Sequence, residues 1–454
     1  MITVDKEVAR FAALPTRERL QALKRIIPQA DVEAVLRKRG QSPRWCRRLP
    51  GEFVVWFVIA LSLFCRDCYR QVFRWLQSRR SLGPPGRSTL CEARKRIGVS
   101  PLRRLARRVV RLLGGPDTPG AYYRGMRLMA LDGFVLDLPD TPENERVFGR
   151  PQGGRTPGAF PQARVVALCE TGSHVLWRWR VRSIRVGELR VAPHLLAHLE
   201  PDMLLVWDRN FFSYPTLCQV IGRGAQLLAR LRKNLVFEPI RRLADGSYLA
   251  QAYPSPGHRA TDREGVQVRV IDYTLDDPHR PGHEQRHRLL TTLLDERLDP
   301  APRVVELYHE RWEEELGIDE LKTHQRERPV LRSQTPRGVL QEMEGLLLGH
   351  YMVRVLMQEA AAAQRIDPQR ISFTGALKIL RCRLPECPRS PVGQRRWRRE
   401  LVQEIAQEVL PPRRNRINPR VIKTKMSRWK KKGPEHRRYP QPEKEFRDAI
   451  MVLH

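Results

Sequence analysis

Two aspartates follow apolar runs at positions where a carboxylate could hold a metal ion. Asp132 follows residues 128–131 and precedes Gly133, and Asp208 follows residues 203–207. A carboxylate at the end of a buried strand can face a shared site at the edge of a sheet, although an Asp there also commonly caps a turn. Phosphodiester cleavage by metal-activated water needs two divalent ions about 3.5 to 4 Å apart, held by carboxylates from different elements.

A third acidic residue belongs to a regularly spaced set, Tyr308, Arg311, Glu315 and Lys322. If this segment is one helix, a rotation of about 100° per residue places all four side chains within an arc of about 60°. One carboxylate among two cations and a phenol suits a metal ligand flanked by groups that grip phosphate oxygens. Arg311 and Glu315 are also four residues apart, so a surface salt bridge explains the same spacing.

The elements that would position these residues form an alternating pattern. Runs rich in β-forming residues predict strands at 127–138, 163–170, 174–181, 203–207 and 226–231, with helices at 188–199 and 215–222. Strands first in a meander and then alternating with helices predict a mixed α/β sheet. Residues 234–294 lose the helical period, which predicts an inserted β subdomain. Helix resumes near Pro302, with breaks at Pro329 and Pro336, and continues past Met357.

The first part of the chain, residues 8–115, predicts an all-α N-terminal domain. Its longest apolar run, 53–64, has 12 residues. A helix that spans a bilayer needs about 20, so this run predicts a buried core helix. No secretory signal precedes it, and we expect a cytoplasmic protein.

Two basic helices are predicted in the same domain. After a Gly-Pro-Pro-Gly break, Thr89 and Glu92 have the spacing of a capping box, which predicts a helix that carries Arg94, Lys95 and Arg96 and could enter a DNA groove. Residues 102–113 place apolar side chains on one side and arginines on the other. A core helix with a solvated basic face and direct contact with phosphates both explain that pattern.

The charge of the whole chain favours a polyanionic partner. Lys and Arg total 83 against 50 Asp and Glu, a formal net charge of +33. Such an excess repels itself unless a polyanion such as nucleic acid is nearby. From about residue 389 an Arg/Lys-rich tail with Trp429 and Tyr439 predicts a flexible arm that binds phosphates, and a tail that only improves solubility is the alternative.

The spaced set Tyr308, Arg311, Glu315 and Lys322 matches the YREK signature of the insertion-sequence-4 family of transposases, which this chain resembles. The segments around Asp132, 138–144, 208–211 and 308–312 fall in the family's order, and residues 47–102 resemble its N-terminal domain. One departure is Asn210, where the family usually has glycine. Asn tolerates left-handed backbone better than most residues, so the turn there could be kept.

The resemblance implies a DDE transposase with an RNase H-like catalytic core, which cuts and rejoins DNA at the ends of an insertion sequence. Asp132, Asp208 and Glu315 would hold two Mg2+ ions, for which Mn2+ could substitute. One ion would activate water or a DNA 3′-hydroxyl, and the other would stabilise the leaving oxygen. The residues implied to bind DNA are Tyr308, Arg311, Lys322, Arg94, Lys95 and Arg96.

The implied partners are double-stranded DNA of the element's terminal inverted repeats and of the target, bound in the nucleoid by a homodimer in the synaptic complex, with no membrane contact. We expect a helical DNA-binding domain (1–118), two parts of the catalytic core (119–233 and 301–388), an inserted β subdomain (234–300) and a basic tail (389–454). Two other classes stay open. One is a catalytically silent DNA-binding protein derived from a transposase, and the other is a nuclease acting on structured DNA without strand transfer.

Overall fold

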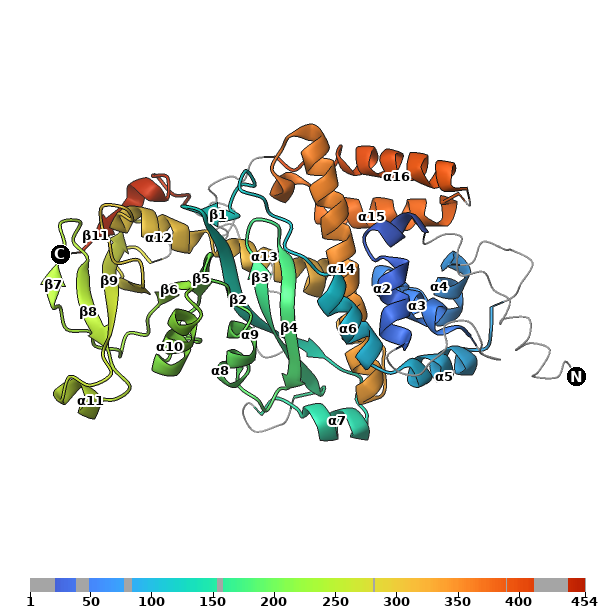
Figure 1. Cartoon of the computed structure of the whole chain (residues 1–454), viewed down its shortest axis with the longest axis horizontal. Helices are drawn as coiled ribbons and strands as arrows, with labels where there is room; N and C mark the ends of the chain where they lie inside the picture. The colour runs from blue at the N-terminus through green and yellow to red at the C-terminus, as the bar shows by residue number, and fades with distance from the viewer. Residues whose placement is uncertain are drawn as a thin grey trace, which may run out of the picture. The chain divides into compact units, whose positions relative to one another are not determined.

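The chain is a mixed α/β protein (Figure 1). It divides into two compact units. The computed structural model describes residues 21–37, 49–76, 84–152, 158–280, 282–388, 390–411 and 440–453, except the side chains of residues 21, 22 and 312–314. The first unit comprises Met1–His198 and Glu313–Leu410, and the second comprises Leu199–Trp312 and Pro411–His454. The predicted catalytic core is therefore divided between the two units. The predicted basic arm lies mostly outside the described residues, which omit 412–439.

Helices make up the N-terminal part of the first unit, as predicted. They are η1 (Gln21–Arg25), α2 (Gln29–Arg37), α3 (Gly51–Leu63), α4 (Tyr69–Leu76), α5 (Arg87–Ile97) and α6 (Ser100–Val109). Helix α3 is buried from Glu52 to Leu63, which confirms the predicted core helix. Within the described ranges, no helix is both long and apolar enough to cross a membrane. Helix α5 begins at Arg87 and has no side-chain cap, so the predicted capping box is wrong: the extended Gly86 already ends the preceding Pro-Pro segment.

The first unit also contains an antiparallel sheet. Its strands are β1 (Tyr122–Tyr123), β2 (Met126–Asp137), β3 (Gln162–Glu170) and β4 (Val175–Ser183). Strand β2 pairs with β1 and β3, β3 pairs with β4, and β4 is an edge strand. The register places Asp132 opposite Ala167 and Ala167 opposite Trp179. Directly opposed residues of an antiparallel pair share a face, so Asp132 and Trp179 lie on the same face. This arrangement confirms the predicted meander.

Short helices connect these strands and lead into the long helix α14. The other helices of the first unit are α7 (Pro142–Phe148), α8 (Glu188–Val191), α9 (Pro193–Leu196), α13 (Trp312–Asp319), η2 (Glu320–Gln325), α14 (Pro336–Gln364), η3 (Pro368–Arg370), α15 (Phe373–Arg383), η4 (Leu384–Glu386) and α16 (Pro391–Ile405). Helix α16 buries Trp397 and Leu401 and packs on α14 and α15. The expectation of a basic tail from residue 389 is therefore wrong for this stretch, because its apolar stripe forms part of the core.

Helix α14 organises the first unit, because it contacts α3, α6, α15, α16 and β4. Two glycines, one turn apart, bring it close to α3. A Cβ atom on Gly345 would lie 2.8 Å from the carbonyl oxygen of Val58, and one on Gly349 would collide with the side chain of Ser62. The two backbones therefore approach at a distance that larger residues would prevent.

The second unit contains one sheet with helices. Its elements are β5 (Met203–Trp207), α10 (Tyr214–Gly222), β6 (Gln226–Arg230), β7 (Arg241–Arg242), β8 (Tyr248–Ala252), α11 (Pro256–Ala260), β9 (Val266–Leu275), β10 (His287–Thr291), α12 (Ala301–His309), η5 (Arg447–Ala449) and β11 (Ile450–Val452). Strands β5 and β6 are parallel, and β6 then pairs antiparallel with β10, followed by β9, β8 and β7. The β-rich region after residue 234 is therefore confirmed, and it continues the sheet of β5 and β6.

The last described residues fold onto the second unit. Strand β11 pairs antiparallel with β9, next to β8 in the same sheet (Figure 1). The buried carboxylate of Asp277 accepts hydrogen bonds from the backbone nitrogens of Glu443 at 3.1 Å and Lys444 at 3.2 Å. His309 of α12 stacks on Phe446 with 3.6 Å between ring centroids. Residues 443–452 are thus an integral part of this unit.

Candidate catalytic site

Asp132, in the first unit, lies within a strand and not at its end. Strand β2 continues to Asp137, because its pairing with β3 extends to Asp137 opposite Gln162. This interior position agrees with the strand predicted at 127–138, whereas the reading of Asp132 as a residue that ends a strand is wrong. Its side chain is half-buried, and Oδ1 accepts a hydrogen bond of 2.7 Å from the backbone nitrogen of Gly133.

Gly133 gives room to a second carboxylate, which the sequence did not single out. A Cβ atom at Gly133 would lie 2.6 Å from Oε1 of Glu188, which accepts a hydrogen bond of 2.8 Å from Arg164. Successive residues of a strand point to opposite faces of the sheet. Glu188 therefore covers the face opposite Asp132, and we assign it to packing and not to metal binding.

Asp208, in the second unit, directly follows β5, as predicted. Its Oδ1 accepts a hydrogen bond of 2.6 Å from the nitrogen of Arg209, and its carbonyl oxygen accepts one of 3.1 Å from Phe211. Asn210 is not among the residues with positive φ. The turn after β5 thus forms without left-handed backbone, so the glycine usual at this position is not required by this geometry.

Tyr308 and Arg311 lie near Asp208 in the same unit. Burial raises the pKa of Tyr308 to about 12, while Arg311 opposes that shift and Asp208 adds to it. The guanidinium carbon of Arg311 is 5.9 Å from the centroid of the Tyr308 ring. The Tyr308 hydroxyl is buried and has no hydrogen-bond partner among the described residues. The charge of Arg230, at the end of β6, also lowers the pKa of this hydroxyl. The sequence predicted the strand that carries Arg230, but no pattern marked Arg230 as a site residue.

The four signature residues do not share one helix. Helix α12 ends at His309, and α13 begins at Trp312 after a turn. Glu315 lies in α13, and Lys322 lies in the π-helical η2. A rotation of 100° per residue does not hold across the turn between α12 and α13. It does not hold from α13 into η2 either, because a π-helix has wider turns than an α-helix. The predicted common arc on one helix is therefore wrong. Tyr308 and Arg311 belong to the second unit, and Glu315 and Lys322 belong to the first.

A buried polar cluster centred on Glu320 holds the segment that carries Glu315 and Lys322. The carboxylate of Glu320 contacts Arg354 and His350 of α14 and His174 of the β3–β4 turn. Glu315 is half-buried, whereas Lys322 is exposed. The cluster fixes η2 to α14 and to the turn, and it therefore positions both signature residues. Its sequence signal was weak, since the participants are far apart in the chain.

The three basic residues of α5 have different environments. Arg94 is buried and donates hydrogen bonds to Ser333 Oγ at 3.2 Å, to Gly338 O at 3.1 Å and to the Tyr69 hydroxyl. Arg96 donates to the carbonyl oxygen of Leu49 at 2.6 Å. Lys95 is exposed and pairs with Glu92 at 2.7 Å. Of these three residues predicted to bind DNA, Lys95 is exposed, Arg96 is half-buried, and Arg94 is part of the packed interior.

A basic cleft of about 680 Å³ in the first unit borders this helix. The cations along its lining are Arg70, Arg87, Arg94, Lys95, Arg328, Arg332 and Arg337. Asp67 is the one carboxylate among the described residues that line it. The cleft therefore carries a strong positive charge, which suits phosphate groups.

The three predicted metal ligands are divided between the units. Asp132 and Glu315 belong to the first unit, and Asp208 belongs to the second. In the part of the chain that the structure describes, no three His, Cys, Asp or Glu side chains are grouped so that they could hold a metal ion.

Family models match most of the chain. The model described as "Transposase DDE domain" matches residues 123–352, and the model described as "Insertion element 4 transposase N-terminal" matches residues 17–107. The chain is 29% identical over 433 residues to "Transposase InsG for insertion sequence element IS4" of Escherichia coli (strain K12), which covers 93% of this chain and 95% of that protein. It is 28% identical over 197 residues to "Putative transposase InsZ" of the same organism, which covers 43% of this chain and 66% of that protein.

A solved structure is also similar, "Cryo-EM structure of piggyBac transposase synaptic complex with hairpin DNA (SNHP)". The TM-score is 0.42 and the sequence identity is 13%, and the match covers 87% of this chain and 86% of that chain.

Proposed function

The chain belongs to the insertion-sequence-4 family of DDE transposases, and from this membership we propose that Asp132, Asp208 and Glu315 hold two Mg2+ ions for cutting and rejoining DNA at the ends of a mobile element. The observation that carries the proposal is the match to the DDE domain over residues 123–352, which contains all three carboxylates in order. Bound Mg2+ would activate the attacking hydroxyl and stabilise the leaving oxygen.

The donor chemistry of the three residues fits magnesium. Carboxylate oxygens are the protein ligands that Mg2+ usually takes, together with substrate phosphates and water. Asp132 and Asp208 are half-buried, and each has one carboxylate oxygen that accepts a neighbouring backbone N–H. These bonds hold each carboxylate in a defined orientation. Mn2+ should substitute, because it accepts the same ligands.

We further propose that β2, β3 and β4 together with β5 and β6 are the strands of an RNase H-like core. Support comes from the antiparallel β2–β3–β4 meander of the first unit and from the parallel β5–β6 pair of the second. The strands from β7 to β10 would then be an insertion between the second aspartate and the glutamate. Their position in the chain, between Asp208 and Glu315, supports that assignment.

The role of Tyr308, Arg311 and Lys322 would be to bind phosphates at the element's ends. A buried hydroxyl that makes no hydrogen bond costs about 1 to 3 kcal/mol, so the Tyr308 hydroxyl favours a partner such as a phosphate oxygen. Arg311 lies beside it, and the exposed ammonium of Lys322 can meet DNA. The basic cleft at α5, with Lys95 at its border, would hold the terminal repeat. Two ends cut in concert suggest a homodimer in the synaptic complex.

Cleavage of an end substrate tests this function. The purified full chain, incubated with Mg2+ and a duplex that carries its element's terminal repeat, should cut at the repeat. The variant Glu315→Gln should bind the duplex with wild-type affinity and lose cleavage by at least about 1000-fold, because an amide cannot replace a charged ligand. Undiminished cleavage by this variant would refute the assignment.

A neighbouring carboxylate provides the control. Asp319 ends α13 and accepts a hydrogen bond of 2.5 Å from Thr323, so Asp319→Asn changes one charge on the same helix. This control should keep its cleavage activity. A wild-type chain that binds the repeat but does not cut it would instead be a silent DNA-binding derivative. Cutting without joining to a target duplex would indicate a nuclease.

A further inference from the structure

Strand β4, the edge of the first unit's sheet, carries arginines at alternate positions, Arg178, Arg180 and Arg182. Each donates a hydrogen bond from Nη1 to the carbonyl oxygen of the preceding residue, at 3.0, 3.1 and 3.0 Å respectively. On most exposed edge strands, carbonyl groups like these stay open to pairing with a strand of another chain. The edge of β4 therefore presents positive charge where an ordinary edge presents open carbonyl groups.

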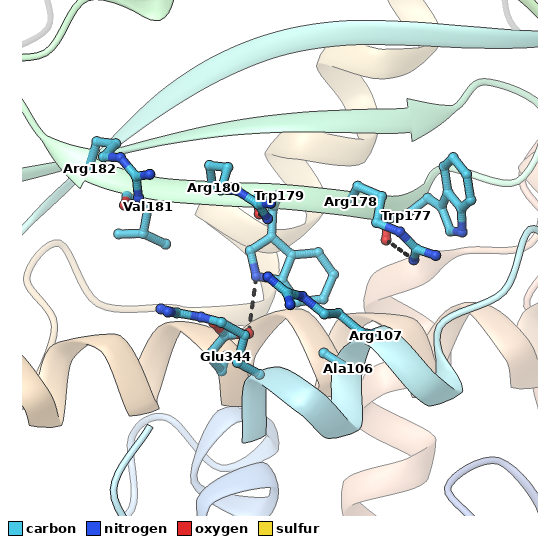
Figure 2. Close-up of a pocket in the computed structure, with 10 residues that line it drawn as sticks. Ala106, Arg107, Trp177, Arg178, Trp179, Arg180, Val181, Arg182 and Glu344 are labelled. Carbon is cyan, nitrogen blue, oxygen red and sulfur yellow. Dashed lines mark hydrogen bonds and ion pairs between the residues drawn. The ribbon is translucent and has the colours of Figure 1, made fainter. Parts of the chain in front are cut away.

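A cleft of about 210 Å³ lies between β4 and helix α6, as Figure 2 shows. Its described lining includes the three β4 arginines and, from α6, Arg103 and Arg107. Glu344 of α14 is the single carboxylate in that lining. The cleft therefore combines five cationic side chains with one anion, and the excess is uncompensated within its walls.

Glu344 is already engaged by groups that hold the cleft together. Its side chain is buried, and Oε1 accepts a hydrogen bond of 2.9 Å from Arg103. Oε2 accepts one of 3.1 Å from the Trp179 indole (Figure 2). The pKa of Arg180 is lowered by burial first and then by the charges of Arg107, Arg182 and Arg103. The arginines thus repel one another, and a bound polyanion would relieve that repulsion.

We propose that β4 and α6 form a DNA-binding surface, separate from the cleft at α5, that holds the sugar-phosphate backbone of duplex DNA through Arg107, Arg178, Arg180 and Arg182. This inference rests on the proposed function, which makes DNA the substrate. Contacts to the backbone position DNA without reading its sequence. The β4–α6 surface would therefore bind flanking or target DNA of any sequence.

The same surface disfavours other occupants. Trp177 and Trp179 are 8% and 9% exposed, so they offer no platform on which unpaired bases could stack. A strand from a second copy would need the outward carbonyls of β4, which the arginine side chains occupy. Alternate arginines on a strand repeat at about 7 Å, and such a row of charge on a rigid element suits the regular charge of a duplex.

Salt-dependent binding tests the proposal. The full chain and the triple variant Arg178→Gln, Arg180→Gln, Arg182→Gln are titrated with a labelled duplex of arbitrary sequence in Mg2+-free buffer at several salt concentrations. Each phosphate contact contributes about 0.9 to the slope of log affinity against log salt. The triple variant should lower the slope by about 2 to 3 and weaken binding at least about 10-fold.

A matched control separates this surface from total charge. Helix α16 exposes Arg395, Arg396 and Arg399, and their replacement by Gln removes the same charge. This control should keep the wild-type slope, and a triple Arg→Lys variant on β4 should keep most of it. An equal loss in the α16 control, or an unchanged slope in the β4 Gln variant, would overturn the proposal.

Two further readouts keep the test decisive. If the triple Gln variant aggregates, the single change Arg182→Glu at an exposed position should still lower the slope, and no change would overturn the proposal. Cleavage of the terminal repeat with Mg2+ is measured separately. If the wild-type chain cuts the terminal repeat and the β4 variant binds duplex DNA normally, the result rejects only the proposed β4–α6 surface. If the wild-type chain does not cut the terminal repeat but the β4 variant binds duplex DNA poorly, the result rejects only the proposed function.

Discussion

Glu320 and Arg354 form a two-point ion pair in the interior of the first unit, with Arg354 Nε 2.8 Å from Glu320 Oε2 and Nη2 bonded to Oε1. Burial alone would raise the pKa of Glu320, but Arg354 and His174 hold it well below its usual range. Glu320 begins η2, and Arg354 lies in α14. The pair therefore fixes the segment between Glu315 and Lys322, although neither partner is expected to touch DNA.

Glu320→Gln should destabilise the protein by about 3 kcal/mol, because it leaves the buried Arg354 charge without its partner. Denaturant unfolding of both proteins measures the difference. The control is Glu386→Gln, which removes an exposed carboxylate that pairs with Arg383 and should cost less than about 1 kcal/mol. Equal effects of the two changes would show that the buried pair has no special role.

Acidification should destabilise the first unit in two steps. Burial lowers the pKa of His350 from 6.5, so the unfolded chain binds the proton more readily and stability falls as the pH drops below about 6.5. The lowered pKa of Glu320 adds a second loss below its ordinary value of 4.5. Thermal unfolding midpoints across this range should decline in both windows, and the lower decline should be smaller in Glu320→Gln. A midpoint that is constant with pH would contradict both assignments.

Gly345→Ala should destabilise the protein by about 1 to 3 kcal/mol, because the new methyl group meets a backbone oxygen of α3 that cannot move alone. Gly222→Ala is the matched control, since nothing lies within 4 Å of the added Cβ and alanine favours the helix. Chemical denaturation should show opposite signs for the two variants. Stabilisation by both would mean that α3 and α14 are not in close contact.

Tyr308→Phe should stabilise the protein by about 1 to 3 kcal/mol, because it removes a buried hydroxyl that makes no hydrogen bond among the described residues. If that hydroxyl binds a phosphate oxygen, the same variant should cut the terminal repeat at least about 10-fold more slowly. Since the pKa of Tyr308 is about 12, wild-type activity should show no titration of this residue between about pH 7 and pH 10. Wild-type cleavage rates in Tyr308→Phe would remove the hydroxyl from the proposed site.

Lys322→Ala should weaken binding to the terminal repeat and lower the salt slope by about 1, which corresponds to one lost phosphate contact. Its side chain is exposed, so folding should be unaffected. Lys378→Ala on α15 removes another exposed lysine and serves as the control. If both variants gave the same slope of log affinity against log salt, Lys322 would have no specific role in binding the repeat.

Local patterns in the sequence predicted the strands well. Strands β2 to β6 and helix α3 have strong periodicity or continuous apolar runs, and their predicted and observed bounds agree closely. The capacity of α16 to pack was also present in the sequence, since Trp397, Leu401 and Ile405 recur every four residues. Its many arginines obscured that stripe. Charge composition alone is therefore a poor guide to whether a segment is folded.

The parts of the site that the sequence did not predict depend on tertiary contacts. No proline or glycine marks the end of α12 at His309, so the interrupted signature helix has no local signal. The Glu320 cluster joins residues 146 and 34 positions apart, which no local pattern connects.

Strand β11 has a consequence for synthesis. The ribosome releases β9 long before Ile450–Val452, yet the two strands are neighbours in the finished sheet. Until then, β9 lacks its β11 partner, and the Asp277 carboxylate lacks the backbone nitrogens of Glu443 and Lys444. The unit that contains Asp208 can therefore reach its complete form only after residue 452 has been made, so a nascent chain stalled before that point would lack it.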